Sequence, residues 1–228
     1  MHRTRTLVLA TSLCWGACSR ASEPSPAPAS QATVVTSPSA PEERSLPMDT
    51  LGELPSAPAG VARVQEPAVA AEGETVRVRE FHPNGKLSTE RSERIGPGGS
   101  TTRVGPMKAW FENGQLRIEG GYDEQGKSSG RWRYWDERGA LLREGDFAGG
   151  LREGDWVQYH SNGRKAYEGL LHVGQNEGPW RYWHENGALM AEGSYVNNLR
   201  EGSWMFWDES GAVDARLTGY YEKNVRVR

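Results

Sequence analysis

Cysteine is nearly absent from this chain, which has two cysteines in 228 residues. Both of them, Cys14 and Cys18, lie near the start, so the sequence after residue 18 has no residue that can form a disulfide. A secreted domain without disulfides has to be held together by its own packing. The same absence excludes cysteine nucleophiles and cysteine metal ligands from the rest of the chain.

An excess of charge of one sign is also lacking. The chain has 27 lysine and arginine residues against 30 aspartate and glutamate residues, a formal net charge of −3. Nucleic-acid-binding proteins carry a basic surplus that neutralises phosphates, so nucleic acid is excluded as a partner. The glycine-rich segment 96–99 lacks the Lys-Ser/Thr pair of a phosphate-binding loop. We expect neither a cofactor nor a small-molecule substrate.

Aromatic residues are missing from a long stretch near the start of the chain. Residues 21–71 contain no Phe, Trp or Tyr and are dominated by Ser, Pro, Ala, Val and Glu. Such a composition buries too little apolar surface to offset the entropy lost on ordering. We therefore expect a disordered linker over residues 19–72.

The start of the chain is typical of a secretory signal. Arg3 and Arg5 precede a short apolar run, residues 7–13, and the small pair at 16–17 stands directly before Cys18. The apolar run is too short to span a membrane as a mature helix. The pair of small residues before a cysteine resembles a bacterial lipobox, which implies cleavage before Cys18 and lipid attachment to its thiol.

These features predict a signal peptide over residues 1–18 and an exported lipoprotein anchored in the cell envelope. The residue after Cys18 is Ser19 rather than Asp, which favours the outer membrane in a source with two membranes. A long linker then lets the domain stand off the membrane. The alternative is an ordinary signal peptide cut nearby, which leaves Cys18 without a role.

The second half of the chain repeats one motif. The repeat length is about 24 residues, and a fixed period of this kind indicates a repeat architecture with a long surface. A degraded first copy and a loop occupy residues 73–104, and the regular repeats occupy residues 105–228. The copies begin at Gly105, Gly130, Gly154, Gly178 and Gly202.

Each repeat contains two strand-type runs joined by a turn signal. An aromatic-rich run such as residues 132–135 suits a pleated, half-buried surface, and the Asn-Gly pair that follows is the strongest short hairpin signal. We predict an all-β fold: an elongated antiparallel meander of stacked β-hairpin repeats in a single-layer twisted sheet, with about ten to twelve strands. The turn glycines are Gly114, Gly139, Gly163, Gly187 and Gly211.

A two-residue turn at the Asn-Gly position fixes the register of each hairpin. Counting outward places Arg133 opposite Glu144, and Trp132 opposite Gly145 with its ring over the bare glycine. Leu141 then shares the face of Trp132. The rival is a longer loop with a bulge, in which the glycine is left-handed and the pairing slips. The structural repeat positions are Trp132, Trp156, Trp180 and Trp204, with Gly145, Gly169 and Gly193.

Two recurring polar columns suggest chemistry but are better explained by structure. His160 and His184 occupy equivalent places, with Asp136 and Asp208 in the same column. Equivalent strands one hairpin apart are separated by about 10 Å, whereas zinc ligands lie about 2 Å from the ion, so we predict no metal site. The glutamates of the other column each have a cation partner in their hairpin, which indicates ion pairing rather than acid–base catalysis. They are Glu119, Glu144, Glu168 and Glu192.

One column of aromatic residues is the candidate binding surface. As structure, these rings would pack from strand to strand. As function, they would form a stripe suited to a protein partner, a peptide or a glycan. The column consists of Trp110, Trp135, Tyr159, Trp183 and Trp207.

The pattern Gly-x-Trp-x-x-Tyr/Trp-x-x-Asn-Gly-x-Leu-x-x-Glu-Gly-x-Tyr resembles the variant MORN repeat family, whose repeats occur in many YwqK-type toxin–antitoxin antitoxins. The resemblance covers residue 105 to about residue 219. It implies stacked β-hairpins used for protein or membrane contact, and it supplies no catalytic residues. We expect a non-enzymatic envelope lipoprotein whose repeat surface binds a protein partner or acts as a scaffold. The alternatives are an antitoxin-like neutraliser of a partner toxin and a glycan-binding module.

Overall fold

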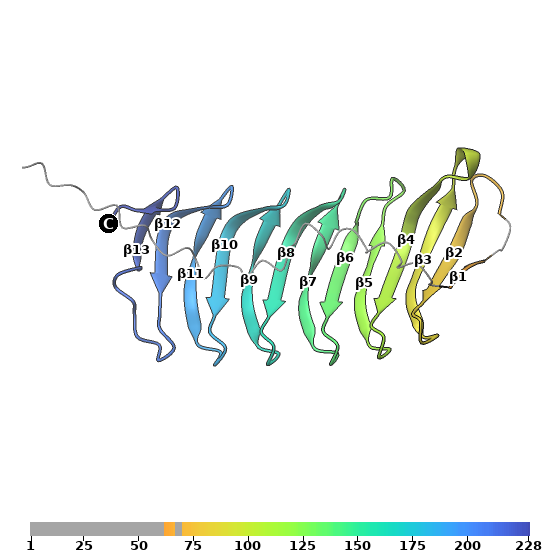
Figure 1. Cartoon of the computed structure of the whole chain (residues 1–228). Coiled ribbons are helices and arrows are strands. Elements are labelled where there is room, and N and C mark those ends of the chain that lie inside the picture. Colours follow the sequence, from red (N-terminus) through yellow and green to blue (C-terminus); the bar gives the residue numbers. More distant parts are fainter. Residues whose placement is uncertain (1–61, 67–69) are drawn as a thin grey trace, which may run out of the picture. The chain divides into compact units, whose positions relative to one another are not determined.

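The computed structural model describes residues 62–66 and 70–228, which form one antiparallel sheet with the strands in sequence order (Figure 1). The predicted signal, Cys18 and most of the predicted linker lie outside the described residues. Among the described residues, one 3-10 turn, Pro97–Gly99, lies between two of the strands. The strands are β1 (Arg63–Glu66), β2 (Thr75–Phe81), β3 (Leu87–Ile95), β4 (Thr101–Trp110), β5 (Leu116–Tyr122), β6 (Gly130–Trp135), β7 (Leu141–Ala148), β8 (Leu151–Tyr159), β9 (Lys165–His172), β10 (Gln175–Trp183), β11 (Leu189–Val196), β12 (Leu199–Phe206), β13 (Gly219–Glu222) and β14 (Val225–Arg226).

The predicted fold class is confirmed. Each strand pairs only with its neighbours in sequence, and the sheet stays open because β1 and β14 form its two edges. No helix within residues 62–66 and 70–228 is long and apolar enough to cross a membrane.

The sheet has fourteen strands rather than the expected ten to twelve. One extra strand, β1, falls inside the range 19–72 that composition assigned to a linker. Its residues pair with β2, where Val64 lies opposite Arg79. The guanidinium of Arg63 also donates to Glu93 at 2.6 Å. This ion pair and the backbone pairing of β1 with β2 thus extend the sheet past the predicted boundary.

The Asn-Gly turn is not the predicted two-residue turn, and this prediction was wrong. In the β6–β7 hairpin, the Asp136 amide donates to the Ala140 carbonyl and the Gly139 amide donates to the Asp136 carbonyl, both at 2.9 Å. The loop between the paired residues is therefore longer, and Gly139 is left-handed with φ 85°. Two-residue turns occur instead at the other end of the strands, between consecutive hairpins, where Val173 and Gly174 have φ 49° and 77°.

A bulge in the second strand cancels the extra loop residue. Trp135 pairs with Leu141, but Tyr134 pairs with Arg143, so Leu142 is the bulged residue. Beyond the bulge, Arg133 lies opposite Glu144 and Trp132 opposite Gly145, as predicted. Leu141 pairs with Trp135 and therefore shares its face, which corrects its predicted place beside Trp132.

Each tryptophan of the Gly-x-Trp motif covers the glycine of the preceding hairpin, not the glycine opposite it in its own hairpin. A Cβ added to Gly145 would overlap the indole of Trp156. The cause is a second bulge, because Gly154 and Asp155 are inserted where β7 pairs with β8. The same overlap links Gly120 with Trp132, Gly169 with Trp180 and Gly193 with Trp204.

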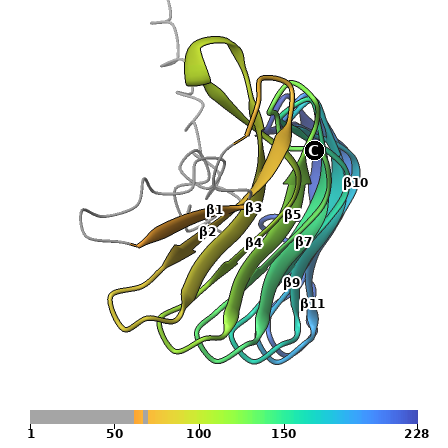
Figure 2. The same cartoon turned by 90° about the vertical axis from the view of Figure 1, so that its right-hand side faces the viewer.

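The core lies on one face of the sheet, which we call the core face and which carries Trp132 and Tyr134. Aromatic rings contact one another along it, with Phe147 5.6 Å from Trp132 and 5.3 Å from Trp156, and a second run of ring contacts extends from Tyr167 to Tyr221. Trp132 is 2% exposed although the sheet has one layer. The strands are curved when the sheet is viewed end-on (Figure 2). Stacked neighbours bury the core as in other repeat proteins.

The aromatic core is closed differently at its two ends. In β2 and β3 the core face carries charges, and buried Arg91 donates to Glu80 at 2.7 Å and Glu93 at 2.8 Å. The hydrogen bond from Arg91 lowers the pKa of Glu80. At the other end Tyr221 is fully buried and donates to the Leu217 carbonyl at 2.6 Å. These ends act as caps of the array.

Candidate binding face

The face opposite the core carries every residue of the predicted aromatic column, and we call it the ladder face. Trp135 lies on it because Trp135 follows Tyr134, whose side chain is in the core. All five rings are half-buried, one in each hairpin close to the loops. Their cross-strand partners are mostly apolar: Leu116 for Trp110, Leu141 for Trp135, Lys165 for Tyr159, Leu189 for Trp183 and Val213 for Trp207.

The rings of this aromatic stripe do not pack on one another. The ring contacts found within the described residues join core-face residues, such as Tyr195 and Trp204 at 5.0 Å, and none joins two members of the stripe. The Lys165 ammonium lies 5.8 Å from the Trp183 ring. Ring-to-ring stacking thus belongs to the other face, and the stripe leaves part of each ring open to a partner.

The backbone beneath the stripe is held by the histidines of the loops. His160 Nε2 donates to the Trp183 carbonyl at 2.8 Å, and His184 Nε2 donates to the Trp207 carbonyl at 2.9 Å. Within the described part of the chain, no group of three or more His, Cys, Asp or Glu residues is placed to hold a metal ion. The histidines of this column therefore tie their hairpins to the next, whereas Asp136 and Asp208 accept hydrogen bonds from amides of their own loops.

The asparagines of the Asn-Gly turns have a second role that the sequence reasoning missed. Asn162 Nδ2 donates to the Glu185 carbonyl at 2.7 Å, and Asn186 Nδ2 donates to the Glu209 carbonyl at 2.8 Å. A loop with an Asn-Gly turn is thus fastened to the loop of the following hairpin. The recurring His-x-Asn-Gly spacing was the available signal, because both side chains recur at the repeat length.

A row of alternating charges runs beside the aromatic stripe. Arg133 contacts Glu144 of its own hairpin at 3.3 Å and Glu119 of the preceding hairpin at 3.7 Å. Arg181 likewise contacts Glu192 at 3.5 Å and Glu168 at 3.8 Å. In register order, the charge row comprises Arg79, Glu90, Lys108, Glu119, Arg133, Glu144, Val157, Glu168, Arg181 and Glu192.

Glu144 is the least exposed carboxylate of this row, and it has two arginine partners. Arg131 reaches it at 3.2 Å, and the Tyr159 hydroxyl donates to it at 3.3 Å. Burial opposes ionisation, but the hydrogen bonds from Arg133 and Arg131 outweigh it and lower the pKa of Glu144. Burial and this carboxylate together raise the pKa of Tyr159. The hydrogen bond between Tyr159 and Glu144 therefore joins the aromatic stripe to the charge row.

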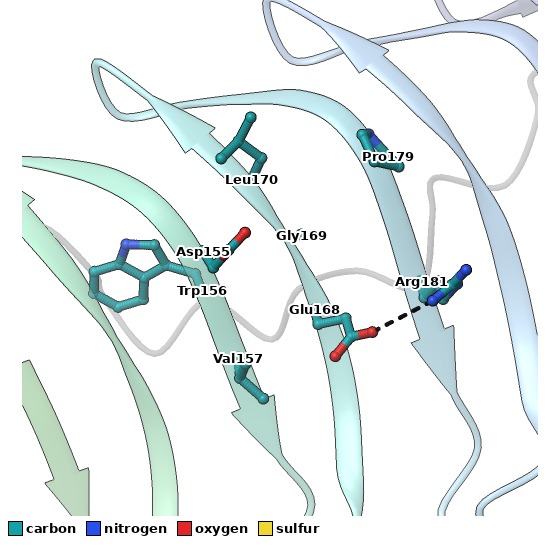
Figure 3. A pocket seen from close by; sticks show the side chains of 8 residues that line it. All are labelled: Asp155, Trp156, Val157, Glu168, Gly169, Leu170, Pro179 and Arg181. Carbon is teal, nitrogen blue, oxygen red and sulfur yellow. Dashed lines mark ion pairs between the residues drawn. The ribbon is translucent and has the colours of Figure 1, made fainter.

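The charge row is interrupted at Val157 between two glutamates, and it ends at Glu192, which lies opposite Met205. The surface is hollowed at Val157. An open depression of about 540 Å³ lies over β8, β9 and β10 (Figure 3). Its lining combines apolar side chains with charged ones at the rim, and Trp156 points away from it toward the previous hairpin. The lining residues are Asp155, Trp156, Val157, Glu168, Gly169, Leu170, Pro179 and Arg181.

Comparison with known families agrees with this geometry. The family model for the MORN repeat variant matches residues 103–124 and 176–197. These two matches support a MORN-repeat protein. The two matched MORN segments cover β4–β5 and β10–β11, two hairpins with the same loop and bulge.

Comparison with individual proteins adds little. No curated protein matches the chain. Among solved structures, the GtfA/B complex bound to UDP and GlcNAc is similar at 13% identity, with a TM-score of 0.23. The likeness covers 61% of this chain and 25% of that one, so it spans a quarter of the other protein and carries no argument about this one.

Proposed function

We propose that this MORN-repeat chain is a non-enzymatic binding or scaffolding protein of the cell envelope and meets a protein partner through its ladder face. The observation that carries the proposal is the aromatic stripe, whose five rings are half-buried and do not stack on one another. Large rings that are rigid and partly open provide contact area at a low entropy cost. A protein partner that covers them buries apolar surface.

The charge row supports a protein rather than a membrane or a nucleic acid as the occupant of this face. Its charges alternate, as in Glu119, Arg133 and Glu144, so the row has no excess of either sign. Such a pattern orients a partner of complementary charges but attracts neither phosphates nor anionic lipids strongly. Trp, Tyr and Arg are also the residue types enriched in protein interfaces.

The export half of the proposal rests on the start of the chain. A lipid on Cys18 would hold the protein at the envelope, and residues 19–61 would separate the anchor from the sheet. Metabolic labelling with a palmitate analogue tests this step. Labelled wild type and unlabelled Cys18→Ala support the anchor, whereas a Cys18→Ala protein that keeps both label and membrane fraction refutes it.

Partner binding is tested with full-length protein in its native envelope. Trp135→Ser and Trp183→Ser remove rings from the stripe. Val196→Ser is the matched control, because Val196 is 44% exposed but lies at the other end of the strands, beside a two-residue turn. After mild solubilisation, we expect a co-purifying protein with wild type and the control but not with the stripe variants. A small toxin-like partner would point to the antitoxin alternative. Equal recovery with all variants would refute binding through the stripe.

A further inference from the structure

The depression at Val157 exists because one cation of the charge row is replaced by a short apolar residue. In the neighbouring hairpins the equivalent residues are Arg133 and Arg181, and each bridges two glutamates. Val157 lies in register between Glu144 and Glu168 but cannot pair with either. Arg131 and Lys165 neutralise these two glutamates instead, at 3.2 Å and 2.6 Å.

The walls of the depression also differ from the equivalent residues of the two adjacent hairpins. Leu170 is 37% exposed, and the equivalent residues in the adjacent hairpins are Asp146 and Ser194. Pro179 lies in the bulge between β9 and β10, where a missing amide hydrogen costs nothing. The combination of Val157, Leu170 and Pro179 occurs at one place among the repeats, so the packing that recurs between all hairpins does not explain it.

The rim of the depression has a negative charge available for a partner. Asp155 is exposed and makes no ion pair with any residue in the described part of the chain. Glu168 is already held by Lys165 and Arg181, and Arg181 keeps 60% of its side chain exposed. A cation next to the apolar floor would therefore meet Asp155.

We propose that this depression, with Val157, Leu170 and Pro179 as its apolar wall and Asp155 at its rim, binds an apolar side chain of the protein partner that is adjacent to a basic residue. This inference rests on the proposed function, because it assigns a specific contact to the same face. The strands β8, β9 and β10 each have a neighbouring strand on both sides, so the partner is recognised by side chains and not by added strand pairing.

The probe is a capped dipeptide, acetyl-Leu-Lys-amide, titrated into the full chain with methyl groups labelled for NMR. We expect saturable shifts of the Val157 and Leu170 methyl signals and none at Val196. Acetyl-Gly-Lys-amide lacks the apolar group and should bind about tenfold more weakly. Acetyl-Leu-Glu-amide should also bind more weakly, and Asp155→Asn should remove the preference for lysine over glutamate.

Val157→Arg is the decisive variant, because it places the residue of the adjacent repeats in the depression. It should complete the charge row, keep or raise the melting temperature, and abolish the Leu170 shift. Leu170→Ser, which copies the residue at position 194, is the second variant if Val157→Arg does not fold. Equal binding of the Gly-Lys peptide, or unchanged binding to both variants, overturns the inference. If stripe variants lose the envelope partner while Val157→Arg keeps it, the proposed function stands and this contact does not.

Discussion

The indole of Trp156 lies over Gly145 of the preceding hairpin, and its Nε1 donates to the Asp146 carbonyl at 3.1 Å. Trp180 repeats the hydrogen bond with the Leu170 carbonyl at 3.1 Å. One tryptophan side chain thus fills the space left by a glycine, and its indole N–H donates to the backbone carbonyl of the residue that follows this glycine. This contact fastens consecutive hairpins to each other.

Gly145→Ala should therefore destabilise the fold strongly. The new methyl group would overlap the Trp156 ring, and overpacking in a core costs about 1–3 kcal/mol or more. Gly163→Ala is the control, because Gly163 has φ 81° but open space around it, so its cost comes from the backbone alone. Urea unfolding should show the larger loss for Gly145→Ala. A smaller loss than for Gly163→Ala would contradict the packing role of Trp156.

Val173→Asn should stabilise the protein. Val173 is the first residue of a two-residue turn with φ 49°, a left-handed conformation that is costly for a β-branched side chain. Asn197 holds the equivalent place with φ 50°. We expect a gain of about 1 kcal/mol in the free energy of unfolding. Val196→Asn, on the same edge, should give no gain, and an equal effect of both changes would argue against strain at Val173.

The pairing of His172 with Glu153 should make stability depend on pH. The hydrogen bond and charge of Glu153 raise the pKa of His172. This contribution is present below the unfolded histidine pKa of about 6.5 and is lost as pH rises through the folded value. The hydrogen bond from the Val173 amide and, second to it, the one from His172 lower the pKa of Glu153. The stability that Glu153 contributes is therefore lost as pH falls through the pKa of Glu153 in the folded protein.

An NMR titration of His172 measures this effect directly. The midpoint should lie above that of the same histidine in urea-unfolded protein. Glu153→Gln should bring the folded midpoint back toward the unfolded one. An unchanged midpoint in Glu153→Gln would show that the 2.8 Å contact between His172 and Glu153 is not formed in solution.

Arg133 and Glu144 should show a small favourable coupling in a double-mutant cycle. Both side chains are partly exposed, and exposed pairs contribute under about 1 kcal/mol. Reversing both charges should recover only part of the loss, because Arg133 also contacts Glu119 and Glu144 also contacts Arg131. Chemical unfolding of the four proteins of the cycle measures the coupling. A coupling of zero would mean that the charge row has no energetic role.

The register within each hairpin could be predicted because two patterns agree on it. Arg133 with Glu144 and Trp132 with Gly145 follow from the same count, and both pairings are present. The turn type could not be predicted, because a longer loop with a bulge at Leu142 leaves that count unchanged. Local pattern alone does not separate these two solutions.

Contacts between hairpins could not be derived from the sequence. They depend on the bulge at Gly154 and Asp155, which shifts β8 against β7 and turns Trp156 over Gly145. The aromatic stripe was found because its members share one place in the repeat. The charge row across hairpins and the depression at Val157 were not, since both require strands of different hairpins to be placed side by side.

Site-specific photo-cross-linking in intact cells tests the central claim most directly. A photoreactive amino acid would replace Trp135, Tyr159 or Trp183 in the aromatic stripe, and Leu151 or Val196 as controls at the other end of the strands, where the two-residue turns lie. Binding through the aromatic stripe predicts one discrete protein adduct from the three stripe positions and none from the controls. Adducts from the controls alone, with no adduct from the stripe, would contradict it.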